Sequence, residues 1–431
     1  MPFVLYVLAL AVFAQGTSEF MLSGLVTHIA RDMNVSLSSA GLLTSAFAIG
    51  IAVGAPLMAV LSRRWSRRRA LLGFLVTFLL VHVVGALTTS FAVLVGTRVV
   101  GAFAYAGFLA VALVAATGMV EANAKGRATA VLLSGVTIAC IAGVPAGALI
   151  GQVWGWRSAF WAIALVSSPV VFAILKSVDG SAGSAGSAGS DGSGSVEPDS
   201  VGAVEIVSVR RELRALRRPR LLLTLLLGAL VNGATFCTFT YLAPLVTEVT
   251  GFGDAWVPAM LALFGVGSFL GVTFGGRVAD SRPMPLMVGG GVVLFVGWVV
   301  FAVVAEHSVA VVVLVLVQGG VSFAVGSTLI SQVLYGAVEA PSLAGGFATA
   351  AFNVGAAVGP WVGGVAMGAG LGYRGPLWVS AGMVGGSLVV AGCVFGGLWV
   401  RRGWAGGGGV GGGACAGAGA GAGVDADADV A

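Results

Sequence analysis

The chain has 431 residues, of which 58% are hydrophobic and only 9% are charged. A soluble domain carries about 25% charged residues, so this composition excludes an ordinary soluble protein and indicates a chain embedded in lipid. The formal net charge of +5 could suit nucleic acid, but the basic residues alternate with the apolar segments, which a nucleic-acid surface does not require.

Twelve apolar segments of about 20 residues or more follow one another, each long enough to cross a hydrocarbon core of about 30 Å as a helix. A membrane β-barrel would show alternating segments of about 10 residues. These segments are apolar on all sides, so we expect helices. The predicted spans are residues 3–25, 40–61, 70–88, 91–118, 128–152, 156–175, 221–248, 255–276, 284–304, 308–336, 343–368 and 373–400.

The basic residues gather on one side of these spans. Of the 22 lysines and arginines, 18 follow even-numbered spans, three lie in connections of the opposite parity, and Arg98 alone lies within a span. The positive-inside rule then places both termini in the cytoplasm.

The first span contains Glu19 within GTSEFMLSGL (16–25), and Glu19 is the only one of 17 acidic residues clearly inside a span. Because a carboxylate is costly in a low-dielectric setting, such a group can bind a proton on the acidic side of a membrane and release it on the other. We interpret Glu19 as a proton-coupling residue. The alternative is a glutamate that is merely solvated near the outer interface.

The fourth span carries Arg98, with Tyr105 on the same helix face by i+7 spacing. Arg98 could stabilise ionised Glu19, tie spans 1 and 4 together, or relay charge; a purely structural ion pair is the alternative. The sequence leaves open whether the two side chains touch.

The fifth span has a small residue at every fourth position. Such a face lets a neighbouring helix approach closely, and Pro145 removes a backbone donor and favours a bend. Glycine and alanine are so abundant here that shorter runs arise by chance, but a run of six is expected less than once. The run comprises Gly135, Ala139, Gly143, Gly147, Gly151 and Gly155.

A polar Gly/Ser/Ala segment at 179–195, typical of a flexible linker, separates the first six spans from the last six. The basic stretch 208–220 predicts an amphipathic helix at the membrane surface. We predict an N-terminal six-helix bundle at 1–178, a cytoplasmic linker at 179–220, a C-terminal six-helix bundle at 221–402 and a disordered Gly/Ala-rich tail at 403–431.

The segments after spans 2 and 8 are similar, and aligning Gly54 with Gly271 places Arg63 opposite Asp280. Two units in parallel repeat predict a binding site at their interface and alternating access by rocking. Aromatic surface with a few amide and hydroxyl groups suits an amphipathic, largely uncharged drug, although helix packing is the alternative for each such residue. The candidate cavity residues are Tyr105, Asn232, Phe236, Thr240, Tyr241 and Asn353.

Four stretches resemble the major facilitator superfamily, specifically its twelve-span drug/proton antiporters. GVPAGALIGQVWGWRSAFW (143–161) is similar to the antiporter motif, GTSEFMLSGL with AGLLTSAFAIGIAVGAP (40–56) to the opening of bacterial efflux proteins, and TRVVGAFAYAGFLAVAL (97–113) to the span 4 motif. The loop after span 2 resembles the cytoplasmic signature, although Arg63 stands at its usual acidic position. The resemblance assigns Gly143, Pro145, Gly147 and Gly151 to the antiporter motif and Arg63, Arg67, Arg68, Arg277 and Asp280 to the cytoplasmic loop motifs.

The resemblance implies an all-α membrane protein of two pseudo-symmetric six-helix bundles in a bacterial plasma membrane. Within the family the chain is most similar to actinobacterial chloramphenicol-resistance permeases, which implies proton-coupled efflux of a small amphipathic drug, chloramphenicol first, and antibiotic resistance. Export of a sugar or other small metabolite on the same fold is the alternative.

We expect no enzyme, cofactor or metal, because the four cysteines and three histidines have no ligand spacing. The sequence contains no G-x-x-x-x-G-K-[ST] motif, so we also expect no nucleotide-binding site. The expected partners are protons, the drug and the lipid bilayer, with no nucleic acid, and we expect a monomer.

Overall fold

The structure, a computed structural model, describes residues 2–61, 65–121, 124–177, 218–278, 283–336 and 341–406. Within these ranges the chain is helical and contains no strand, which confirms the all-α prediction. The chain divides into two units at Leu388, and every contact discussed below lies within the first. We use "N-terminal half" for residues 2–177 and "C-terminal half" for residues 218–388.

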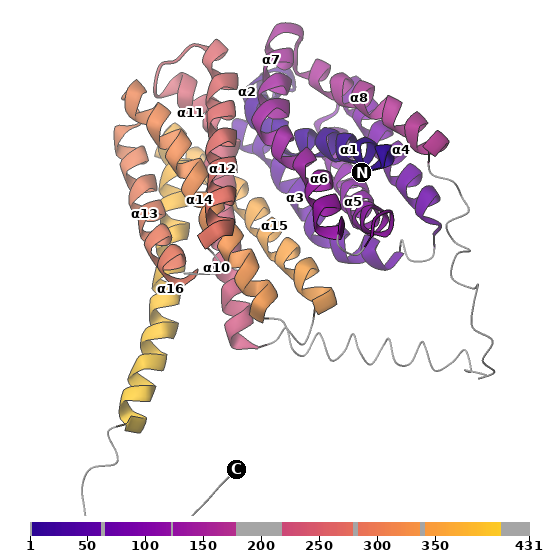
Figure 1. The fold of residues 1–431 in the computed structure, drawn as a ribbon. Coiled ribbons are helices and arrows are strands. Elements are labelled where there is room, and N and C mark those ends of the chain that lie inside the picture. The colour runs from indigo at the N-terminus through magenta and orange to yellow at the C-terminus, as the bar shows by residue number, and fades with distance from the viewer. Residues whose placement is uncertain are drawn as a thin grey trace, which may run out of the picture. The chain divides into compact units, whose positions relative to one another are not determined.

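The N-terminal half consists of long helices with short breaks (Figure 1). A 3-10 segment at Met21–Gly24 follows α1, and a π-helical segment at Ala139–Gly143, called the π segment below, joins α6 to α7. The helices are α1 (Phe3–Phe20), α2 (Val26–Asp32), α3 (Leu37–Leu61), α4 (Arg67–Leu87), α5 (Phe91–Gly118), α6 (Lys125–Ile138), α7 (Val144–Trp154) and α8 (Trp156–Ser177).

The C-terminal half follows a similar scheme and also carries a short helix after its first long one. A 3-10 segment at Asp254–Trp256 precedes α12, and π and 3-10 turns at Met367–Arg374 separate the last two helices. The helices are α10 (Pro219–Thr240), α11 (Leu242–Glu248), α12 (Val257–Val278), α13 (Pro283–Val304), α14 (Ser308–Gly336), α15 (Pro341–Ala366) and α16 (Gly375–Gly406).

Eleven segments of the described chain are long and apolar enough to cross a membrane. The last, Gly345–Cys393, spans 49 residues and covers both α15 and the first part of α16, so the segments account for the twelve predicted spans. Residues 208–217 of the helix predicted at 208–220 and residues 407–431 of the tail predicted at 403–431 lie outside the described residues, and α16 runs to Gly406. The division into two six-helix bundles stays a prediction.

The predicted spans 3–25, 128–152 and 221–248 are not continuous α-helices, and proline accounts for the breaks in the last two. Pro244 has no N–H to bond the Thr240 carbonyl four residues earlier, and the chain leaves helical geometry at Tyr241. Pro145 likewise cannot donate to the Ile141 carbonyl, and the π segment lies immediately before it. The bend predicted from Pro145 therefore takes the form of a wide turn.

The two halves meet along α3 with α15 and along α7 with α12 (Figure 1). Val144 and Ala148 of α7 belong to the same buried cluster as Leu261 of α12. At Gly265 of α12, an added Cβ would stand 2.4 Å from the Cys140 carbonyl oxygen in the π segment. Only glycine leaves room for that backbone contact, which brings the π segment against the C-terminal half.

Candidate functional site

Glu19 lies in the last turn of α1 and is partly buried. The Tyr105 side chain of α5 approaches its carboxyl group, and the Arg98 guanidinium interacts with it electrostatically. The structure therefore brings together the three residues that the sequence singled out in spans 1 and 4. One basic, one phenolic and one acidic group thus share a membrane-embedded setting.

Arg98 is buried in α5, with 2% of its surface exposed. Its Nη1 donates to the Ser18 hydroxyl at 2.9 Å and its Nη2 donates to the Ser18 carbonyl at 2.8 Å. The guanidinium also lies over the Phe47 ring, 4.2 Å from its centroid. Arg98 and Glu19 are both among the described residues, and no direct ion pair joins them. Arg98 instead binds Ser18, the neighbour of Glu19 in the chain.

His82 completes this network, and the sequence reasoning missed it. Its Nε2 lies 2.6 Å from the Ser18 hydroxyl oxygen, and its Nδ1 lies 2.7 Å from the Phe78 carbonyl oxygen. The three histidines have no common spacing, so a search for ligand sets passes over this one. The available signal was a single polar side chain in an apolar span, which needs a partner when it is buried.

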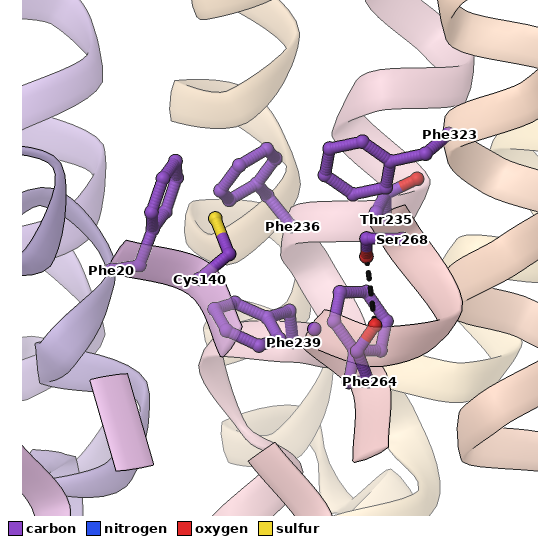
Figure 2. A pocket seen from close by; sticks show the side chains of 9 residues that line it. Phe20, Cys140, Thr235, Phe236, Phe239, Phe264, Ser268 and Phe323 are labelled. Carbon is purple, nitrogen blue, oxygen red and sulfur yellow. Dashed lines mark hydrogen bonds between the residues drawn. The ribbon is translucent and has the colours of Figure 1, made fainter. Parts of the chain in front are cut away.

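A pocket with about 310 Å³ of empty space, which includes space open to solvent, lies between the two halves and is walled largely by phenylalanine (Figure 2). Phe20 stacks on Phe236 with ring centroids 5.6 Å apart, and the ring centroids of Phe239 and Phe264 are 4.7 Å apart. α1 and the π segment supply Phe20 and Cys140 from the N-terminal half, while α10, α12 and α14 supply Thr235, Phe236, Phe239, Phe264, Gly265, Ser268 and Phe323.

The polar groups of this pocket are mostly occupied by their own helices. The Ser268 hydroxyl donates to the Phe264 carbonyl at 2.8 Å (Figure 2), and the Thr235 hydroxyl donates to the Val231 carbonyl at 2.8 Å. The pocket therefore offers aromatic faces with few free hydrogen-bond donors, which suits a flat, weakly polar molecule.

Glu19 belongs to the surroundings of this pocket. The next residue, Phe20, lines it, and Cys140, which also lines it, interacts electrostatically with Glu19. The acid and the aromatic pocket are thus neighbours, so the charge on one affects whatever occupies the other.

Among the predicted cavity residues, Phe236 lines this pocket and the others do not. The Asn232 amide donates to the Phe352 carbonyl at 2.7 Å, and the Tyr241 hydroxyl donates to the Pro360 carbonyl at 2.9 Å. Thr240 is buried, and the Asn353 amide donates to the Thr349 carbonyl of its own helix. Four of the predicted residues thus lie in helix packing, and Tyr105 lies beside Glu19.

The small-residue face of the fifth span packs against the first span. An added Cβ would stand 2.4 Å from the Ala9 carbonyl oxygen at Gly135, 2.1 Å from Thr17 Oγ1 at Gly143 and 2.2 Å from Leu25 Cδ2 at Gly151. The contact at Gly147 is less tight, since an added Cβ there would lie 3.3 Å from Met21 Cβ. The face therefore clamps α6 and α7 onto the helix that carries Glu19.

The basic residues of the loop motifs are described in part. Arg68 donates to the Leu175 carbonyl of α8, Arg67 lies near Gly118 at the end of α5, and Arg277 is exposed in the last turn of α12. Arg63 and Asp280 lie outside the described residues.

At the other ends of α4 and α8, Asp32 binds both Trp156 and Arg157, the two residues that follow Gly155. Trp156 Nε1 donates to Asp32 Oδ2 at 3.0 Å, and Arg157 forms an ion pair with the same oxygen and donates to the Thr88 carbonyl. The Arg157 guanidinium, followed by the Trp156 N–H, holds the pKa of Asp32 below its usual range. This cluster ties α2, α4 and α8 together.

The family model described as Major Facilitator Superfamily matches residues 8–345 of this chain, well over half of it. The chain belongs to the Major Facilitator Superfamily. The predicted membership and fold are confirmed, and the chain is a multi-pass membrane transporter, not an enzyme.

Two known proteins are similar to this chain along nearly their whole length. A chloramphenicol resistance protein of Streptomyces lividans is 53% identical over 391 residues, covering 91% of this chain and 96% of that protein. The inner membrane transport protein YdhP of Escherichia coli K12 is 33% identical over 369 residues, covering 86% and 90%.

Two solved transporter structures share the fold. An inward-facing, unoccupied bacterial homologue of the lysosomal transporter Spinster superposes with a TM-score of 0.72 at 16% identity, covering 90% of this chain and 95% of that one. A D-xylose–proton symporter gives a TM-score of 0.70 at 15% identity, covering 90% and 96%.

Proposed function

We propose that this transporter exports a small, amphipathic, largely uncharged drug from the bacterial cytoplasm in exchange for protons, with chloramphenicol as the first substrate to test. The observation that carries the proposal is the adjacency of Glu19 to a phenylalanine-walled pocket to which both halves contribute. The 53% identical chloramphenicol resistance protein supports the choice of substrate.

Exchange follows from competition between the two cargoes. Arg98 favours the ionised form of Glu19, so the carboxylate can stay deprotonated while the drug is bound and take up its proton only after the drug has left. Each cargo then biases the equilibrium between inward-open and outward-open states only through its differential affinity for them. Proton entry thereby drives drug exit.

The contacts between the halves fit a gate on the outer side, given cytoplasmic termini. The Ser45 hydroxyl donates to the Ala357 carbonyl at 2.7 Å, and Gln152 at the end of α7 donates to the Asp254 carbonyl at 2.7 Å. Positive-inside reasoning places these residues toward the outer ends of their spans. Opening the pocket outward would require these contacts to part.

The pocket favours a drug over a sugar. A sugar presents many hydroxyl groups, each of which needs a partner when it is buried, whereas Thr235 and Ser268 already donate to their own helices. A metabolite exporter would leave the drug sensitivity of expressing cells unchanged, so resistance profiling separates the two functions.

The decisive experiment measures chloramphenicol uptake into energised inverted membrane vesicles, with and without a protonophore. We expect uptake that collapses with the proton gradient. Glu19→Gln should abolish proton-driven uptake while the protein stays in the membrane, because the amide cannot exchange a proton. Full gradient-driven uptake by this variant would refute the role of Glu19.

A further inference from the structure

A buried chain of hydrogen bonds connects Arg98 to His82 through the side chain of Ser18. Arg98 Nη1 and Ser18 Oγ are 2.9 Å apart, and Ser18 Oγ and His82 Nε2 are 2.6 Å apart. Each of the three residues exposes 2% of its surface or less, so water does not compete for these bonds. The chain runs across α5, α1 and α4.

The partners determine where the hydrogens lie. The Phe78 carbonyl can only accept, so His82 Nδ1 carries a hydrogen. Arg98 can only donate, so Ser18 Oγ accepts from it and directs its own hydrogen toward His82 Nε2. This assignment makes His82 a neutral acceptor, which also avoids a second positive charge beside Arg98.

We propose that His82 is a positioning residue for proton coupling: by accepting the Ser18 hydroxyl, it orients Ser18 to hold the Arg98 guanidinium close to Glu19. The inference rests on the proposed function, because it assigns His82 a role only if Glu19 exchanges protons. His82 itself binds neither drug nor proton in this scheme.

Without His82, the Ser18 hydroxyl has another acceptor within its own helix. The neighbouring Thr17 shows the geometry, since its hydroxyl donates to the Phe13 carbonyl one turn earlier at 2.8 Å. Ser18 would turn in the same way toward the Ala14 carbonyl, which withdraws Oγ from Arg98. The guanidinium then keeps its contacts with the Ser18 carbonyl and the Phe47 ring but loses one of its two hydrogen bonds to Ser18.

The charge of Arg98 matters because few groups face Glu19. These are Arg98 and Tyr105 of α5 and Cys140 of the π segment, and Arg98 is the basic one. His82 faces Arg98, Ser18 and the Phe78 carbonyl. An opposite charge within about 4–6 Å moves a carboxyl titration by about one to three pH units. A displaced Arg98 should therefore move the pH dependence of exchange upward by about one unit.

The test compares variants by the pH dependence of protonophore-sensitive chloramphenicol uptake in inverted vesicles. His82→Leu removes the acceptor and should raise the pH midpoint by about one unit. Ser18→Ala should give the same shift, and the double variant no more than either single one, because both act on one chain. His82→Gln supplies an amide oxygen near the position of Nε2 and should restore most of the wild-type profile.

His307→Leu is the matched control, because His307 is exposed between α13 and α14. The pH midpoint of uptake by this variant should equal that of the wild type. Fluorescence-detected size-exclusion chromatography verifies that each variant reaches the membrane intact. If His82→Leu does not reach the membrane intact, the pH midpoint of Ser18→Ala alone tests the positioning role.

An unchanged midpoint in well-folded His82→Leu or Ser18→Ala would overturn the positioning role, as would additive shifts in the double variant. Uptake by the wild type that ignores the protonophore would instead refute proton coupling, and the inference would fall with it. The wild-type measurement therefore separates the two failures.

Discussion

The Ser45 hydroxyl of α3 donates a 2.7 Å hydrogen bond to the Ala357 carbonyl of α15, which joins residues 312 positions apart in the chain. Nearby, Ala48 packs with Ala356 and Ala357 in a small buried cluster beside Phe236. The two halves therefore touch at alanine-sized side chains, where little interdigitation resists their separation.

A reversible bridge across this contact should stop transport. With the four native cysteines replaced by alanine, a Ser45→Cys, Ala357→Cys pair joined by a short, reducible thiol crosslinker should lose chloramphenicol efflux, because the halves can no longer part. Reduction should restore it. A Ser45→Cys, Val354→Cys pair is the control, since Val354 is exposed on α15; efflux that persists in the bridged Ser45–Ala357 pair would contradict a gate here.

The aromatic pocket should determine drug affinity. Phe236→Ala removes a ring that lines the pocket, and the loss of one aromatic contact with the drug costs about 0.5–1.5 kcal/mol, so the KM for drug should rise about two- to tenfold. Phe274→Ala on α12 should leave KM unchanged, because Phe274 is 58% exposed and does not line the pocket. Equal KM values for both variants would exclude this pocket as the drug site.

Cys140 offers an independent probe of the same pocket. As the pocket-lining thiol, it should react with a small maleimide in a variant whose other three cysteines are replaced by alanine, and saturating drug should slow that reaction. Cys237 is buried and faces the Pro376 carbonyl, so a variant that keeps only Cys237 should label slowly with or without drug. Labelling of Cys140 that drug does not slow would argue against occupancy.

The fifth-span glycines should differ in their tolerance of a methyl group. Gly143→Ala forces the π segment away from Thr17, and overpacking of this kind costs about 1–3 kcal/mol. Gly147→Ala faces Met21 at 3.3 Å and should cost less. Thermal melting of the purified transporter in detergent measures both, and a larger loss at Gly147 would contradict the packing described.

The Asp32–Arg157 ion pair should give a measurable pH dependence of stability. Asp32→Asn should lower the free energy of unfolding at neutral pH by about 1 kcal/mol or less, as for other exposed pairs. Because the pKa of Asp32 is lowered in the folded state, this contribution is present above an unfolded-state pKa of about 4 and is lost as the pH falls through the lower folded-state value.

The Tm difference between wild type and Asp32→Asn should therefore stay constant near neutral pH and shrink below about pH 4. Asp254→Asn is the control, because Asp254 contributes its backbone carbonyl to Gln152. A Tm difference between wild type and Asp32→Asn that grows as the pH falls would contradict this prediction.

The spans could be predicted from the sequence because their length and apolar character leave few alternatives in a bilayer. The break before Pro244 was not predicted, because Pro244 lies in an otherwise ordinary apolar run, and the bend predicted from Pro145 did not reveal its π-helical form. Uniformly apolar helices also do not reveal which face lines a cavity, so three of the pocket's phenylalanines, Phe20, Phe264 and Phe323, were missed as lining residues.

The candidate site was predictable to the extent that charge is rare in spans. Glu19 and Arg98 stand out for that reason, and the structure places them within electrostatic reach. The connection through Ser18 and His82 depends on which helices are neighbours, which spacing along a single chain does not reveal.

The π segment also keeps the fifth span in phase with the first. A pattern repeating every four residues rotates by about 40° per repeat around a regular α-helix, so over the four repeats from Gly135 to Gly151 it would wind about 160° away from a straight neighbour. Yet Gly135, Gly143 and Gly151 all face the first span, and the wider turn at Ala139–Gly143 offsets part of that rotation. Deleting one residue there would turn everything beyond it by about 100° and present side chains where glycines now fit, so the residue count of this turn is under as much constraint as its composition.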